Sequence, residues 1–237
     1  MDAMTPLEAV WKADPAPASR EGLSLGRIVA TAIDIADAEG LDGVSMSRVA
    51  KALGFTPMSL YRHVGGKEEL LLHMQDRAIG PPPAVLDPDP DAPWRDGLER
   101  WAWATLHRMR AHPWIQQMVP QTGPPATPNQ LTWLEFGLRA LRPAALSEGE
   151  KLFVILQLNA LTFGDLTFHA ADHASAENAY EALFARFLTP DRFPALIAAF
   201  TGGAFAEGPD PQEDRDAMYR FGLERILDGV DTLVEGR

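Results

Sequence analysis

Apolar residues recur at helical spacing from Leu25 onward. They fall on one face and are Leu25, Ile28, Val29, Ala32, Ile33 and Ala36. Ser24 is placed to cap the start of this helix, and Gly40 is placed to end it. The pattern therefore predicts an amphipathic helix over residues 25–39.

Two shorter helices are predicted next, separated by a tight turn. The first follows Ser45, and its inner face consists of Met46, Val49, Ala50 and Leu53. Gly54 stands where a left-handed C-terminal cap is needed. The second runs from its N-cap Thr56 to about His63, because Pro57 suits a first helical turn. This arrangement is a helix-turn-helix, whose second helix can lie in the major groove of DNA.

A domain boundary is expected after the next helix, which runs from Lys67 to about Ile79. The following segment, GPPPAVLDPDPDAP, cannot be helical, because its prolines remove backbone donors and restrict the residues before them. The N-terminal run DPAPASREG is rich in Pro, Ala and Ser, which favours a mobile arm. The predicted organisation is a flexible arm at 1–22, a helix-turn-helix DNA-binding domain at 23–80, a Pro-rich linker at 81–93 and a C-terminal domain at 94–237.

The C-terminal domain is predicted to be helical throughout. Three stripes of apolar residues at helical spacing begin near Trp94, Trp133 and Leu152, so the natural architecture is all-α, a bundle of helices. Several aromatic residues share this domain with a few polar ones, and apolar walls with few polar groups are typical of a ligand pocket. They are equally typical of an ordinary core, which is the better interpretation for any single aromatic residue.

The last helix is apolar on more than one face. Its apolar residues are Leu223, Ile226, Leu227, Val230, Leu233 and Val234. A helix with two apolar faces needs two partners, so we expect one face to meet a symmetry mate, with Gly222 and Gly229 allowing close approach. The alternative is a helix buried within one subunit.

Composition limits the class of protein. The chain has 237 residues, of which 46% are hydrophobic, and it has no cysteine. Disulfides, thiolate metal sites and cysteine nucleophiles are therefore excluded. The N-terminal residues lack the apolar core of a signal peptide, and the longest apolar stretch, 152–163, is interrupted by Gln157 and Asn159. We expect a soluble cytoplasmic protein that does not span a membrane.

The charge distribution is local. The formal net charge is −12, which by itself would repel a polyanion. Between Gly43 and Lys67, however, the chain has basic residues and no Asp or Glu. Because salt screens charges over about 10 Å, an acid-free surface can bind DNA despite acidic residues elsewhere.

The stretch GLDGVSMSRVAKALGFTPMSLYRHVGGKEELL resembles the DNA-binding segment of tetracycline-repressor (TetR) family transcription regulators. The resemblance extends through HPWIQQMV, TFGDL and FGLERILDGV, which are similar to the regulatory domain of the tetracycline-repressor branch. It implies a ligand-responsive DNA-binding regulator, most simply a repressor released by a small-molecule inducer. It also implies a homodimer formed by the last helix and the helix through 152–168.

The resemblance also assigns roles to residues of the helix-turn-helix. Residues expected near phosphates or the groove edge are Ser47 and Arg48; residues expected to face bases or their rim are Thr56, Pro57, Met58, Ser59 and Arg62; residues expected to contact phosphates are Tyr61, His63 and Lys67. Arginine can hydrogen-bond guanine bidentately, and hydroxyl groups suit phosphate oxygens. The alternatives are that Tyr61 packs against the first helix and that His63 caps the third.

The ligand is predicted to bind without metal. In the tetracycline-repressor branch the drug enters as a magnesium chelate, and a glutamate after the glycine of the TFGDL-like segment helps to hold the metal. Here Phe168 stands where that carboxylate is expected, and an aromatic ring offers no oxygen ligand. We therefore predict no cofactor and an apolar or aromatic ligand. The residues expected to contact it are Trp101, Thr105, Met109, Trp114, Met118, Trp133, Phe136, Asn159, Phe163 and Phe193.

A second class of function is a metal-dependent or small-molecule-modifying enzyme on a helical fold. His169 and His173 are four residues apart, a spacing that can place two metal ligands on one helix face. Neither a third ligand nor a general base accompanies them in the sequence. This alternative is therefore much weaker than a DNA-binding regulator.

Overall fold

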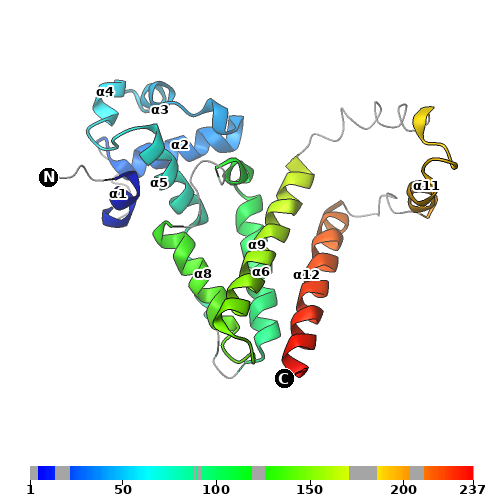
Figure 1. The fold of residues 1–237 in the computed structure, drawn as a ribbon. Coiled ribbons are helices and arrows are strands. Elements are labelled where there is room, and N and C mark those ends of the chain that lie inside the picture. The colour runs from blue at the N-terminus through cyan, green and yellow to red at the C-terminus, as the bar shows by residue number, and fades with distance from the viewer. Residues whose placement is uncertain are drawn as a thin grey trace.

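The computed structural model describes residues 5–13, 22–87, 89, 92–118, 126–170, 186–202 and 211–236. Within these ranges every regular element is helical, which confirms the all-α prediction. Figure 1 shows two groups of helices, with α1 to α5 at one end of the molecule and α6, α8, α9 and α12 side by side at the other.

The first group contains the predicted helix-turn-helix. Its helices are α2 (Leu25–Glu39), the single turn η1 (Leu41–Gly43), α3 (Met46–Leu53), α4 (Pro57–Leu60) and α5 (Lys67–Ile79). Ser24, Ser45 and Thr56 cap α2, α3 and α4, each accepting a backbone N–H three residues later. Gly54 adopts the left-handed conformation, with φ of 77° and ψ of 25°. The caps and the turn are therefore confirmed.

The recognition helix is shorter than predicted. It ends at Leu60, and residues 61–63 continue as a tight turn in which the His63 N–H donates to the Leu60 carbonyl at 2.8 Å. The turn carries Val64 into the core, where it is 1% exposed. The Val64 N–H also donates to the Leu60 carbonyl, at 3.1 Å, so the turn is tied to the end of α4.

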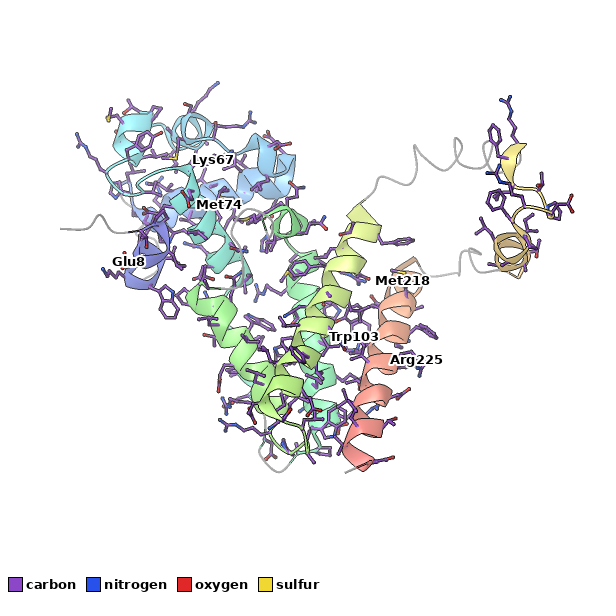
Figure 2. The ribbon with its side chains drawn as sticks, in the orientation of Figure 1. Glu8, Lys67, Met74, Trp103, Met218 and Arg225 are labelled. Atoms are coloured by element: carbon purple, nitrogen blue, oxygen red, sulfur yellow. The ribbon has the colours of Figure 1, made fainter. Side chains whose placement is uncertain are left out.

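The prediction of a flexible arm over residues 1–22 is wrong for its first part. Residues Pro6–Lys12 form a helix, α1, that packs against α5 and buries Ala9 and Val10. Thr5 and Glu8 close its N-terminus as a capping box, in which the Glu8 carboxylate accepts the Thr5 N–H at 2.8 Å. Figure 2 shows Glu8 on this helix, below the helix-turn-helix. The neighbouring prolines and alanines obscured this cap signal in the sequence, and residues 14–21 lie outside the described residues.

The segment predicted to be a Pro-rich linker has little regular structure in its described residues. Its described residues contain one 3-10 turn, η2 (Ala84–Leu86), between α5 and α6. The linker leads into the second group of helices. Their bounds are α6 (Trp94–Arg110), η3 (Pro113–Gln117), α8 (Pro128–Ala140), α9 (Glu148–Ala170) and α12 (Pro211–Glu235). A further short helix, α11 (Pro194–Thr201), lies apart from this bundle in Figure 1.

Hydrogen bonds between side chains and with the backbone connect α6, α9 and α12, the three long helices of the bundle. Arg110 of α6 donates two hydrogen bonds of 3.0 Å to Asp165 of α9 and also bonds Asp216 of α12. Burial alone would lower the pKa of Arg110, but these hydrogen bonds raise it, so the guanidinium stays charged. Tyr219 of α12 donates to the Ala102 carbonyl at 3.1 Å, and burial raises its pKa to about 12.

Helix α9 is, among the described residues, the one helix long and apolar enough to cross a membrane by length and composition. In this structure it packs against α6, α8 and α12. Its Asp165 is 2% exposed and pairs with Arg110 inside the bundle. These are the contacts of a core helix.

Gly137 of α8 allows the bundle to close around Trp101. A Cβ on Gly137 would lie 2.9 Å from Cε2 of Trp101 and 2.8 Å from Cδ1 of Ile155. Gly137→Ala should therefore destabilise the protein by about 1 to 3 kcal/mol, although alanine favours helices. Urea unfolding checks this, with Gly149→Ala as control because its Cβ meets nothing within 4 Å. Equal stability of the two variants would contradict the close packing described for Gly137.

Candidate DNA-binding surface and ligand cavity

The residues predicted to bind DNA lie together on α3, α4, the turn after α4 and the start of α5. Those with exposed side chains are Ser47, Arg48, Thr56, Pro57, Met58, Tyr61, Arg62, His63 and Lys67. Ser59 is half-buried, and its Oγ lies 3.0 Å from Oγ1 of Thr56. Figure 2 shows Lys67 beside this group, at the start of α5. We call these residues the helix-turn-helix surface.

Tyr61 and His63 both have exposed side chains. Tyr61 is 49% exposed, so half of its side chain stays accessible to a partner. The His63 side chain is exposed and forms no hydrogen bond within the described part of the chain, so it does not cap α4. Met58, on the same surface, is 70% exposed. Such exposure of large side chains is typical of a surface with a partner.

One electrostatic expectation needs correction. The sequence is free of acid between Gly43 and Lys67, but the fold brings Glu39, at the end of α2, into an ion pair with Arg48. The Glu39 carboxylate competes with phosphate for this guanidinium. The helix-turn-helix surface is thus less positive at Arg48 than the sequence indicated.

A cavity of about 310 Å³ lies where α5, α6, η3, α8 and α9 meet. Its walls are mainly apolar. The lining residues are Gln75, Ile79, Trp101, Thr105, Arg108, Met109, Ile115, Gln130, Trp133, Leu134, Leu152, Leu156, Asn159 and Phe163. Its size and its few polar groups suit a small organic ligand.

The structure brings six of the predicted ligand-contacting residues to this cavity. They are Trp101, Thr105, Met109, Trp133, Asn159 and Phe163. The other four lie elsewhere: Trp114 donates its indole N–H to Asp37, Met118 is in the core, Phe136 packs beside Arg139, and Phe193 lies just before α11 against Arg192. Helical spacing identifies apolar residues but does not show which neighbour each one meets.

Sequence analysis missed the contribution of α5. Gln75 and Ile79 reach the cavity from the last helix of the DNA-binding domain. Gln75 interrupts an apolar stripe formed with Leu71 and Ile79, and this polar residue on a buried face was the available signal. The remaining lining residues that were missed are Arg108, Ile115, Gln130, Leu134, Leu152 and Leu156.

Three polar hydrogens at the cavity, those of the Trp101 and Trp133 indoles and of the Thr105 hydroxyl, are already bonded to protein. The indole N–H of Trp101 donates to the Trp133 carbonyl, and that of Trp133 donates to the Gly80 carbonyl, both at 2.8 Å. Thr105 Oγ1 donates to the Trp101 carbonyl at 2.9 Å. Gln75 differs, because it is 2% exposed and its Oε1 has no partner among the described residues. The wall therefore offers a buried acceptor that lacks a donor.

The two groups of helices are also joined by hydrogen bonds outside the cavity. Asp37 of α2 accepts from the Trp114 indole at 2.6 Å, and its Oδ1 lies 2.8 Å from Nδ1 of His112. Asp76 of α5 accepts the Asn129 backbone N–H and side-chain amide, each at 2.8 Å. Helix α5 thus belongs to the DNA-binding domain and also forms part of the cavity wall.

Residues 28–74 match the family model for bacterial regulatory proteins of the tetR family, and residues 87–234 match that for the tetracyclin repressor-like C-terminal domain. The chain belongs to the TetR family. TetR-family proteins are DNA-binding transcription regulators, and the matched residues 28–74 include all of the helix-turn-helix surface, up to Lys67.

Among TetR-family proteins the chain is similar to the HTH-type transcriptional repressor DrrR1 of Streptomyces coeruleorubidus. The two are 36% identical over 250 residues, which cover 100% of this chain and 88% of the repressor. The structure also resembles crystal structures of ActR from Streptomyces coelicolor. The complex with (S)-DNPA has 26% identity and a TM-score of 0.71, covering 90% of this chain and 98% of ActR. The complex with actinorhodin has 25% identity and a TM-score of 0.69, covering 90% and 97%.

The TetR-family regulator acts as a dimer, and the structure shows the apolar faces available for it. Exposed apolar residues lie on α9 and α12, and they include Phe153 at 63% and Phe221 at 63%. Leu223 and Leu227 instead face the chain's own bundle. The prediction that Gly222 allows close approach of a symmetry mate needs correction. A Cβ at Gly222 would lie 2.7 Å from Leu161 Cδ1 of the same chain. Its small size serves packing within the subunit.

The enzyme alternative gains no support from the family, which consists of transcription regulators. In the described part of the chain no group of three or more His, Cys, Asp or Glu residues could hold a metal. The side chain of His169 and all of His173 lie outside the described residues.

Two basic residues on the helix-turn-helix surface should affect DNA binding differently. Lys67→Ala should weaken binding to all sequences alike and reduce the salt slope by about one unit, because lysine contacts phosphate. Arg62→Ala should cost about 1 to 3 kcal/mol and relax preference at one base pair. Salt titrations on duplexes with single substitutions check both. Unchanged sequence preference in Arg62→Ala would show that Arg62 does not contact a base.

The two glutamines of the cavity wall should respond oppositely to the same substitution. Gln75→Leu removes a buried acceptor without a partner and should stabilise the protein by about 1 kcal/mol, or about 2 to 4 °C in Tm. Gln130→Leu should destabilise it by about 1 kcal/mol, because Gln130 Oε1 accepts the Ala126 and Thr127 N–H groups, each at 3.1 Å. Thermal unfolding measures both. A clear loss of stability in Gln75→Leu would contradict the unsatisfied acceptor.

Proposed function

We propose that this protein is a cytoplasmic transcriptional repressor that leaves its operator when an aromatic small molecule occupies the cavity. The observation that supports this most is the position of α5, which provides Gln75 and Ile79 to the cavity and Lys67 to the helix-turn-helix surface. A ligand in the cavity therefore touches the helix that frames the DNA-binding domain. The similarity to DrrR1, which is a repressor, supports repression, and the similarity to ActR, which binds actinorhodin, supports an aromatic ligand.

The ligand is bound by protein side chains alone, without a metal ion. No carboxylate is among the described residues that line the cavity. Asp165, the acid of the TFGDL segment, is buried in an ion pair with Arg110. Phe168 is 53% exposed and does not line the cavity. A hard cation would lack charged oxygen ligands here, whereas the walls of Trp101 and Trp133 suit an aromatic ring.

Ligand binding must favour one of two domain arrangements in order to release DNA. The contacts that can differ between them are those of α5 with α8. Asp76 bonds Asn129, and Trp133 bonds the Gly80 carbonyl at the C-terminal end of α5. A ligand between Trp133 and Gln75 would change the position of α5 relative to α8. The spacing of the two recognition helices in the dimer would change with it.

Selection of duplexes from a random library, followed by footprinting, tests the DNA-binding part of this proposal. The dimer should select a palindrome whose half-sites lie one helical turn apart, about 34 to 36 Å, because each subunit presents one recognition helix. A stable monomer that binds one asymmetric half-site with full affinity would overturn the proposal.

The ligand part of the proposal is tested with a candidate inducer. Actinorhodin is the first compound to test, and fluorescence anisotropy of a labelled operator measures the release of DNA.

A further inference from the structure

The cavity has a charge asymmetry that the proposed repressor function does not require. Among the described residues that line it, Arg108 alone is charged. Within the described part of the chain Arg108 forms no ion pair, whereas Arg110, two residues later on α6, bonds two carboxylates. The lining thus contains one positive charge without a negative charge to neutralise it.

The position of Arg108 keeps this charge at the cavity. Its side chain is half-buried, and its Cζ lies 4.0 Å from where a Cβ on Gly80 would stand. Gly80 is the C-cap of α5, and helix C-termini bear partial negative charge. This partial charge favours the guanidinium next to α5 but does not satisfy its five donors. An anionic group on a ligand would do so.

The buried acceptor on α5 adds a second requirement. Gln75 lies on α5 just over one turn before Gly80, and its Oε1 is without a partner among the described residues. A ligand with a hydroxyl or N–H group could donate to this oxygen. The aromatic rings of such a ligand would lie among Trp101, Trp133 and Phe163, between the Arg108 guanidinium and Oε1 of Gln75.

We propose that the cavity selects an aromatic acid, whose ionised group pairs with Arg108 and whose donor group satisfies Oε1 of Gln75. This proposal rests on the proposed ligand cavity and names the chemical class of its ligand. The net charge of −12 does not prevent it, because screening limits distant charges while Arg108 acts at contact distance. Both recognition groups lie on or beside α5, so the acidic ligand contacts the helix shared with the DNA-binding domain.

The test compares two fluorescent probes that differ by one charged group. The anionic probe is 8-anilino-1-naphthalenesulfonate, and the neutral probe is N-phenyl-1-naphthylamine, which has the same rings without the sulfonate. Arg108→Gln should weaken binding of the anionic probe about tenfold, because a hydrogen bond to a charged group is lost. Binding of the neutral probe should change less than twofold. Arg108→Lys, which keeps the charge, should bind the anionic probe within about threefold of the wild type.

The control is Arg100→Gln, the same substitution on an exposed arginine of α6 that does not line the cavity. It should leave both probes unchanged. Equal weakening of both probes in Arg108→Gln, an unchanged anionic probe, or no saturable binding of either probe would overturn the proposal. Unfolding curves establish that each variant is folded. Because no DNA is present, a failure here is distinct from a failure of operator binding.

Discussion

The structure depends on the position of one helix, α5, between two domains. Its outer face packs against α1 and α2, and its other face meets α8. Asp76 accepts three hydrogen bonds from Asn129, two at its carboxylate and one at its backbone carbonyl, and the Gly80 carbonyl accepts the Trp133 indole N–H. These bonds hold the C-terminal half of α5 against the cavity, while its start at Lys67 lies on the helix-turn-helix surface. The cavity and the helix-turn-helix surface therefore share a rigid element.

The sequence predicted local features well, because each depends on neighbouring residues. The caps at Ser24, Ser45 and Thr56 and the turn at Gly54 follow from side-chain and backbone preferences within three or four positions. Helix α1 was not predicted although its capping box is equally local, because the Pro- and Ala-rich residues that follow it favour a mobile arm.

Features that depend on contacts between distant segments were only partly predicted. The aromatic residues on the α6 and α8 side of the cavity were identified, but Gln75 was not, because only the packing of the domains shows that α5 reaches it. The ion pair between Glu39 and Arg48 was likewise not predicted from the sequence, because it joins the end of α2 to the start of α3. For the same reason Trp114 contacts Asp37 of α2 instead of the cavity.

The central claim is that occupancy of the cavity and binding of DNA are coupled through α5. Coupling is reciprocal, so DNA must change ligand affinity by the same factor as ligand changes DNA affinity. The most direct measurement is the affinity of 8-anilino-1-naphthalenesulfonate for the free dimer and for the dimer saturated with its selected operator. The account predicts binding at least about fivefold weaker in the presence of operator. Equal affinity in the two states would contradict it.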